Sequence, residues 1–181
     1  MRREIQAQAL QLFRDQGYDA TTVEQVAAAS LVSESTLYRH FPTKADLVLQ
    51  DDMDPLIDAA FAAQPPELNA VEAIVGAMRE VLGHVSGAEA AGMRERMNLL
   101  WTVPELRATA LDQLVQGIEQ VAALAAARTG RTVDDPQIRA LAGAVVGAAM
   151  AALLSAVGDP GADLVGLVAE YLDHIEAALR L

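Results

Sequence analysis

A chain of 181 residues with 52% hydrophobic and 21% charged side chains is long enough to bury a sizeable core, which argues against intrinsic disorder. The lack of cysteine excludes disulfides and thiolate-bound zinc, and an aromatic content of 4% favours closely packed helices over a β-sandwich. The net charge of −12 argues against a nucleic-acid partner for the chain taken as a whole. We expect an all-α protein.

Two apolar stretches bear on where the protein resides. The N-terminal sequence MRREIQAQALQLF reaches Glu4 and Gln6 before a signal core could form, so we expect a cytoplasmic protein. Residues 140–157 contain no charged side chain over 18 positions, the minimum for a membrane span, but most are Ala and Gly, whose transfer energies are weak. We interpret this stretch as a buried helix and expect no membrane partner.

The acidic charge is unevenly distributed. Residues 1–47 contain five basic and six acidic side chains, which leaves a net charge of −11 for the remainder. A nearly neutral N-terminal module binds DNA if its basic groups share one face, with weak non-specific affinity and a strong need for dimerisation.

Two helices are predicted at the start of the chain. Apolar residues recur at helical spacing over residues 5–13, and Gly17 follows as a stop signal. Thr21 and Glu24 match a capping box in which the Thr21 hydroxyl accepts from the Glu24 amide. This pattern predicts a second helix that ends near Ala29.

A third short helix follows after a tight turn. Ser33 is its predicted N-cap, Leu37 and Phe41 form its buried pair, and Pro42 ends it before Thr43 caps the next helix. Two short helices joined in this way match a helix-turn-helix whose second helix enters the major groove of DNA. Its other face carries polar and basic side chains: Glu34, Ser35, Thr36, Tyr38, Arg39 and His40.

The run TTVEQVAAASLVSESTLYRHFPTKADL resembles the N-terminal domain of the TetR family of transcriptional repressors. The resemblance implies a homodimer that grips two half-sites of a palindromic double-stranded operator. It places the base-reading helix on residues 33–40. It places phosphate contacts on Thr22, Thr36, Tyr38, His40 and Lys44. The full predicted DNA-binding set is Thr22, Ser33, Glu34, Ser35, Thr36, Tyr38, Arg39, His40 and Lys44.

Leu31 and Ser35 depart from the family pattern, which usually has glycine at both positions. Leucine in left-handed space costs on the order of 1 kcal/mol, so we expect a somewhat different turn. Ser35 adds a hydroxyl that could meet a phosphate or a base edge.

Several DNA-facing candidates have alternative readings. Glu34 either stabilises the helix dipole or accepts from a cytosine amino group. Tyr38 either packs half-buried or contacts a phosphate. Arg39 and His40 could simply be solvated charge and a solvated helix end.

The rest of the chain predicts a second helical domain, so that residues 1–47 and 48–181 form the two domains and the whole has about nine helices. Helical patterns cover residues 44–63, 71–85, 88–102, 104–128 and 136–157, and a last helix starts at Leu164. The first of these helices would link the two domains mechanically.

The final two predicted helices favour dimerisation. Gly143, Gly147 and many alanines would let helix backbones approach closely, and the last helix has a broad apolar stripe. Two such hairpins would form an intersubunit four-helix bundle, as in the TetR family. Alternatively, the small residues pack only within one subunit.

An effector site is predicted among the helices of the second domain. The stretches DDMDPLIDAAFAA, RERMNLLWTVPELRATALDQL and TGRTVDDPQIRALAGAVVGAAMAAL resemble the actinobacterial TetR subgroup described as acyl-CoA-like-ligand regulators. Flexible apolar side chains next to arginines suit an amphiphile with an anionic head. A small hydrophobic drug or metabolite is the alternative, with the arginines pairing to Glu89, Glu95 and Glu105. The predicted lining is Met78, Met93, Arg94, Arg96, Met97, Leu100, Trp101 and Arg107.

The sequence therefore predicts a ligand-responsive regulator, more specifically a repressor that its effector releases from DNA. An enzyme is the rival class, but His40, His84 and His174 are far apart and no catalytic or dinucleotide motif occurs. We expect no catalytic residue, no metal site and no cofactor. A dimeric interaction protein that does not bind DNA is a further alternative, which would leave Tyr38 and Lys44 without a purpose.

Overall fold

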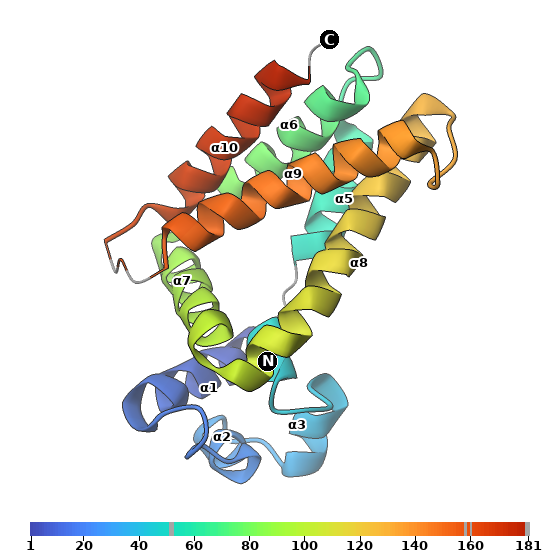
Figure 1. The fold of residues 1–181 in the computed structure, drawn as a ribbon. Helices are drawn as coiled ribbons and strands as arrows, with labels where there is room; N and C mark the ends of the chain where they lie inside the picture. The colour runs from blue at the N-terminus through green and yellow to red at the C-terminus, as the bar shows by residue number, and fades with distance from the viewer. Residues whose placement is uncertain (51–52, 158, 160, 180–181) are drawn as a thin grey trace. The chain divides into compact units, whose positions relative to one another are not determined.

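The computed structural model describes residues 1–50, 53–157, 159 and 161–179, and this part of the chain contains ten helices and no strand (Figure 1). The expected all-α class is confirmed. The chain forms two compact units. The first unit comprises Met1–Gln50 and Ala91–Ala110, and the second comprises Asp51–Ala90 and Leu111–Leu181.

The first unit begins with α1 (Arg2–Gln16), which buries Ile5, Ala9 and Phe13 almost completely. Gly17 ends the helix with φ 89°, a left-handed value that glycine adopts without strain, and its amide donates to the Phe13 carbonyl at 2.9 Å. The predicted first helix and its stop signal are both present.

The capping box of α2 (Val23–Ala29) lies one residue later than predicted. Thr22, not Thr21, is the N-cap, and its hydroxyl accepts from the Gln25 amide at 3.3 Å. The Gln25 side chain accepts from the Thr22 amide at 2.9 Å. The Thr21 hydroxyl is buried and donates to the Gly17 carbonyl at 2.8 Å, so it is already engaged with the end of α1.

The turn between α2 and α3 (Glu34–His40) places Leu31 in the left-handed region, at the position where the resemblance predicts glycine. Leu31 has φ 55° and is the one non-glycine residue with positive φ in the described ranges. Its side chain is 93% exposed, so no packing compensates the backbone strain.

Replacing Leu31 by glycine is expected to stabilise the protein by about 1 kcal/mol, because relief of left-handed strain outweighs the greater freedom of glycine in the unfolded chain. Thermal unfolding should shift upward by roughly 2–4 °C. Leu31→Ala is the matched control: alanine keeps the Cβ atom and hence the strain, so its stability should stay close to that of the wild type. Equal stability of the glycine and alanine variants would show that the turn stores no strain.

The predicted helix over residues 44–63 is divided in the structure. It appears as α4 (Asp46–Leu49) and α5 (Met53–Ala63), and Gln50 between them is extended, with φ −75° and ψ 133°. Pro55 has no amide hydrogen and its ring would clash with the carbonyl four residues earlier, so it is tolerated only in the first turn of a new helix. The continuous helix predicted over residues 44–63 is therefore wrong.

Residues far along the chain complete the core of the first unit. They come from α7 (Gly87–Thr102) and α8 (Pro104–Thr129). Leu106 is fully buried in the same cluster as Phe13, Leu37 and Phe41, and Leu99 packs against it. The helix-turn-helix core therefore depends on residues 99–106 as well as on the first 48.

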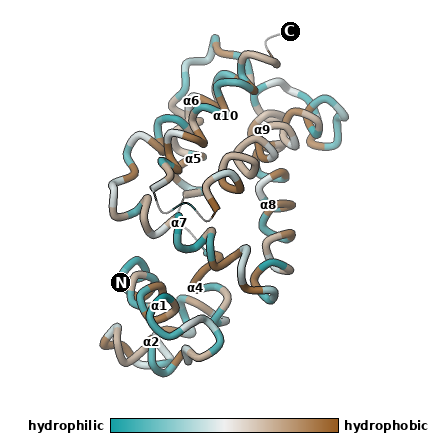
Figure 2. The backbone as a smooth tube through the Cα atoms, turned by 60° about the vertical axis from the view of Figure 1, so that its left-hand side comes forward, coloured by the Kyte–Doolittle hydropathy of each residue, from teal (hydrophilic) through white to brown (hydrophobic). Residues whose placement is uncertain are grey.

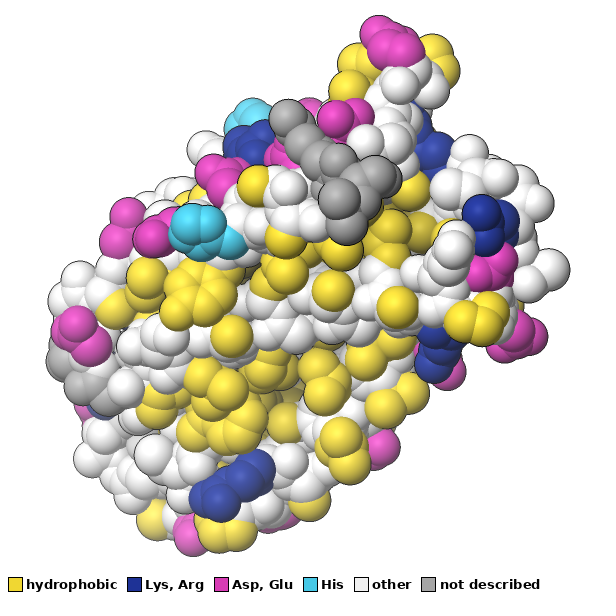
Figure 3. Space-filling model, turned by 45° about the horizontal axis from the view of Figure 1, so that its top comes forward, with side chains coloured by type: hydrophobic (Ala, Val, Ile, Leu, Met, Phe, Trp, Pro, Cys, Tyr) yellow, Lys and Arg dark blue, Asp and Glu magenta, His cyan; other side chains and the backbone are white. Residues whose placement is uncertain are grey.

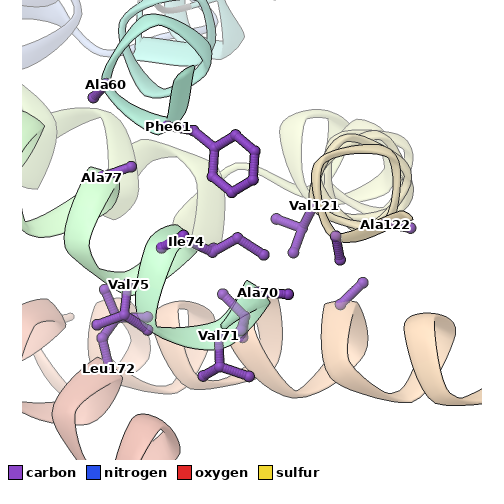
Figure 4. Packing of buried hydrophobic residues seen from close by; sticks show 14 of the residues in the cluster. Ala60, Phe61, Ala70, Val71, Ile74, Val75, Ala77, Val121, Ala122 and Leu172 are labelled. Carbon is purple, nitrogen blue, oxygen red and sulfur yellow. The ribbon is translucent and has the colours of Figure 1, made fainter. Parts of the chain in front are cut away.

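The second unit is built from α5, α6 (Ala70–Gly83), most of α8, α9 (Pro136–Ser155) and α10 (Leu164–Ala178). The predicted helices over 71–85, 88–102, 104–128 and 136–157 start and end within two residues of observed ones. Ile74 and Val75 of α6 are fully buried, and Phe61, Val121 and Leu172 lie around them (Figure 4). These apolar side chains belong to the buried cluster that forms the core of this unit.

Arg128 of α8 secures the loop that precedes α6. Its guanidinium donates from Nε to the Leu68 carbonyl at 2.9 Å and from Nη2 to the Pro65 carbonyl, and lies 5.5 Å from the centre of the Phe61 ring. One planar cation therefore satisfies two loop carbonyls and covers an aromatic face.

The described residues leave one face of α9 partly exposed. Ile138, Ala142, Val145 and Ala152 are buried, but Leu154 is 45% exposed, and the helix is apolar over most of its length (Figure 2). By length and composition α9 could also cross a membrane. The space-filling view shows hydrophobic side chains gathered over one face of the molecule, with most charged groups near its margin (Figure 3). The prediction of a buried helix over residues 140–157 thus holds for one side of α9 only.

Candidate functional site

The face of α3 opposite the core exposes the side chains predicted to meet DNA. Thr22, Ser33, Glu34, Ser35 and Arg39 are exposed, as is Tyr38, which is 44% accessible. The remaining three predicted side chains are half-buried and none is sealed inside the unit: Thr36, His40 and Lys44.

Two buried residues hold this face outward. Leu37 on α3 and Phe41 at its C-cap are both completely buried, as their spacing predicts. The Ser33 hydroxyl caps the helix by accepting from the Thr36 amide at 3.2 Å, and it lies 3.0 Å from the Thr36 hydroxyl. Capping and core contacts thus fix the direction of α3, although it has only seven residues.

Lys44 lies in the loop after α3, where its ammonium group is placed against aromatic rings. The Nζ atom is 4.2 Å from the centre of the Tyr18 ring and 6.0 Å from that of Phe13. Neither aromatic residue was among the predicted site residues. Their approach to Lys44 depends on the folding of α1 against the loop, and no spacing in the sequence signals it.

Tyr18 itself is a buried and neutral phenol. It is 5% exposed, and its hydroxyl has no hydrogen-bond partner among the described residues. Burial, followed by the negative charges of Glu105, Asp19 and Asp46, raises the pKa of Tyr18 to about 12. The ring therefore stays uncharged at neutral pH.

The predicted effector residues are divided between the two units. Met78 belongs to α6 in the second unit and packs beside its core. The others belong to the part of α7 and α8 that lies in the first unit, and of these Leu100 is buried. Within the described chain the indole Nε1 of Trp101 is buried without a hydrogen-bond partner. Seven of the eight predicted lining residues thus belong to the first unit and one to the second.

Two of the predicted anion-binding arginines donate to main-chain carbonyls. Arg96 Nη1 lies 3.4 Å from the Gln50 carbonyl, and Arg107 Nη2 lies 3.0 Å from the Trp101 carbonyl. Glu95, a predicted alternative partner for the arginines, instead pairs with Arg14 at 3.4 Å. Burial raises the pKa of Glu95, and the nearby Arg14 opposes that rise.

Gln50 accepts several hydrogen bonds that the sequence does not predict. Its carbonyl also accepts from Gln6 Nε2 at 2.5 Å, and its side-chain oxygen accepts from Arg2 Nη2 at 2.9 Å. The Arg2 guanidinium in turn lies 5.2 Å from the ring centre of Phe41. Gln50 is therefore hydrogen-bonded to residues of α1 and α7 and is linked, through Arg2, to Phe41 at the end of α3.

Comparison with known families agrees with this geometry. The family model described as "Bacterial regulatory proteins, tetR family" matches residues 5–50, and the one described as "MftR C-terminal domain" matches residues 68–180. Because the second match alone covers more than half of the chain, the protein belongs to the TetR family of transcriptional regulators. This is a family of DNA-binding regulators, not of enzymes.

A curated relative is the HTH-type transcriptional regulator TcmR of Streptomyces glaucescens, which is 36% identical over 141 residues. The match covers 74% of this chain and 62% of TcmR, so the chain spans less than two thirds of that relative's length.

Two solved structures share the fold. The fatty acid degradation regulator FadR of Bacillus halodurans aligns with a TM-score of 0.65 at 19% identity, covering 99% of this chain and 96% of that one. FadR of Bacillus subtilis, solved in complex with stearoyl-CoA, aligns with a TM-score of 0.64 at 15% identity, covering 99% and 100%. At these identities the likeness concerns the fold.

Proposed function

We propose that this regulator is a cytoplasmic repressor that binds a palindromic operator as a homodimer and is released by an apolar or amphiphilic effector. The proposal is supported chiefly by the outward face of α3, which carries polar and basic side chains. Leu37 and Phe41 are buried on the opposite face and anchor the helix. Such a helix fits the major groove, and its N-terminal side chains face base edges.

The open face of α9 supports the homodimer. Outside their own helix backbone, no described atom lies within 4 Å of the position that a Cβ atom would take at Gly143 or Gly147. Packing within one described subunit therefore does not require glycine at either position, which disfavours the alternative that these residues serve only internal packing. A second copy of α9 could approach closely there, and a symmetric pair is what two half-sites require.

An acyl-CoA-like effector is supported by two observations. The similar fold of Bacillus subtilis FadR was solved with stearoyl-CoA. In this chain, the predicted effector segment contains Trp101, whose buried indole donor has no partner in the described structure. A buried donor without an acceptor is costly, and a polar group of a ligand would satisfy it.

A small uncharged hydrophobic effector is the second candidate, and the arginine contacts favour it. Arg96 and Arg107 already donate to main-chain carbonyls, so an anionic head group would have to replace those bonds. An apolar molecule would leave both contacts intact.

The proposed coupling between effector and DNA passes through residues 91–110. This segment carries most of the predicted effector residues and also places Leu106 in the helix-turn-helix core. A shift of the segment would therefore disturb the packing beneath α3. Operator would be released in proportion to the effector's preference for the altered state.

Fluorescence anisotropy with a duplex recovered by in vitro selection tests this proposal. We expect lauroyl-CoA to weaken operator binding by about tenfold or more, a typical coupling strength, and coenzyme A without an acyl chain to have little effect. Release by uncharged apolar compounds but not by lauroyl-CoA would support the second candidate. If neither class alters affinity, the protein is a constitutive regulator, and if no duplex is bound, the dimeric interaction protein is the better account.

A further inference from the structure

The ammonium group of Lys44 rests on an aromatic platform, which we define as the rings of Tyr18 and Phe13. The two ring centres are 5.0 Å apart and the rings are inclined by 49°. Lys44 Nζ lies 4.2 Å from the Tyr18 centre, well within the range in which a ring face attracts a cation. Tyr18 thus makes the closer of the two contacts.

Among the described residues no carboxylate forms an ion pair with this ammonium group, although Glu105, Asp19 and Asp46 lie near enough to raise the pKa of Tyr18. The structure records no ion pair for Lys44 within residues 1–50, 53–157, 159 and 161–179. Asp46 is two residues away, but its carboxylate accepts from the Thr43 amide at 2.8 Å and from the Thr43 hydroxyl at 2.7 Å. A ring face restrains a cation without cancelling its charge, so the charge of Lys44 remains available to a phosphate.

Restraining the Lys44 side chain favours phosphate binding because a free lysine side chain is flexible. Its four-carbon stem loses rotamer freedom when the ammonium group binds a phosphate, and this loss weakens binding. A platform that already limits the rotamers in the free protein reduces the loss.

We propose that Tyr18 is a positioning residue for DNA binding: its ring orients Lys44 toward a backbone phosphate, although Tyr18 itself is too buried to touch DNA. The inference rests on the proposed function, to which it adds the phosphate contact that the sequence predicts for Lys44. Because the phenol is neutral, it acts through its ring face and not as an ionic partner of the lysine.

A double-mutant cycle with operator and unrelated duplexes, measured at several salt concentrations, tests the inference. Lys44→Met should lower affinity for every duplex by about 5- to 10-fold and reduce the salt slope of the dimer by about 2. Tyr18→Leu should lower affinity by about 3- to 5-fold on the wild-type background and have no further effect together with Lys44→Met. Tyr18→Phe keeps the ring and should rescue most of the affinity.

The experiment distinguishes failure of the phosphate contact of Lys44 from failure of the positioning role of Tyr18. If Lys44→Met leaves affinity and salt slope unchanged, the phosphate contact predicted for Lys44 is wrong. If Lys44→Met weakens binding but Tyr18→Leu has the same effect on both backgrounds, Tyr18 acts only on the fold and the positioning role is overturned.

A second measurement does not depend on the folding of Tyr18→Leu. Lys44 is the only lysine in the sequence, so lysine labelled with ¹³C at Cε gives a single side-chain NMR signal. Its proton resonance should be shifted upfield by the ring current in the free protein and in Tyr18→Phe.

Tetrafluorophenylalanine at position 18 keeps the shape of the ring but weakens the attraction of its face for a cation, and should lower DNA affinity as Tyr18→Leu does. An unshifted Lys44 signal in the wild type, or full affinity with the fluorinated ring, overturns the proposal.

Discussion

Gly147→Glu is expected to separate the proposed homodimer into folded monomers and to lower affinity for the proposed operator by about 100-fold or more, because two linked half-site contacts are replaced by one. In the described structure a side chain at position 147 has open space around it, so the monomer should tolerate the change. Between two closely packed copies of α9, a buried carboxylate would be both bulky and unpaired. Sedimentation velocity and anisotropy on the same samples measure the two effects.

Gly83→Glu is the matched control for this experiment. Gly83 is the last residue of α6, is exposed, and also has no neighbour within 4 Å of a Cβ atom in the described structure. This variant should stay dimeric and keep wild-type operator affinity. A dimer that survives Gly147→Glu would show that the subunits pair through another surface.

Leu106→Ala is expected to destabilise the DNA-binding unit by about 3 kcal/mol, the usual cost of truncating a fully buried leucine. Leu106 is 0% exposed and packs in the same cluster as Leu37 and Phe41, although it lies more than sixty residues away in sequence. Loss of its side chain should reduce operator affinity because it leaves a cavity in the buried cluster that also contains Leu37 of α3. Urea unfolding followed by anisotropy gives both quantities.

Leu111→Ala provides the comparison within the same helix. Leu111 is 63% exposed, so its truncation should change stability by less than about 0.5 kcal/mol. Similar losses for the two variants would indicate that α8 contributes through its helical stability and not through the core contact of Leu106.

Local signals were sufficient for the helix-turn-helix. The Ser33 cap and the Leu37 and Phe41 pair depend on residues within four positions, and both are present in the structure. The hydrogen bonds between Thr43 and Asp46 are also present, but α4 begins only at Asp46, with Ala45 as its N-cap and no side-chain cap, so the predicted Thr43 cap lies in the turn before the helix. The capping box of α2 was misplaced by one residue. Thr21 and Thr22 are equivalent locally, and only the contact of Thr21 with the end of α1 separates them.

Tertiary contacts account for most of what the sequence could not predict. The role of Leu106 in the first core and the aromatic platform under Lys44 both join segments distant in sequence. The break between α4 and α5 is different, because Pro55 marks it locally. The helical pattern over residues 44–63 nevertheless fits one continuous helix, and it does not by itself reveal the break.

The predicted effector site shows the limit of patterns in apolar helices. Methionine and leucine at helical spacing fit a ligand cavity and a core equally well, and Leu100 is in fact buried. The arginines could be assigned to an anion from sequence, but not to the carbonyls that Arg96 and Arg107 contact, since those partners depend on the fold.

In vitro selection from a random duplex library, followed by hydroxyl-radical footprinting, tests most directly whether α3 reads DNA twice in a symmetric particle. We predict an inverted repeat whose half-sites are about one helical turn, roughly 10 base pairs, apart and are protected together on one face of the duplex. Selected duplexes with no shared sequence, or with one isolated half-site and protection on one side only, would contradict this account.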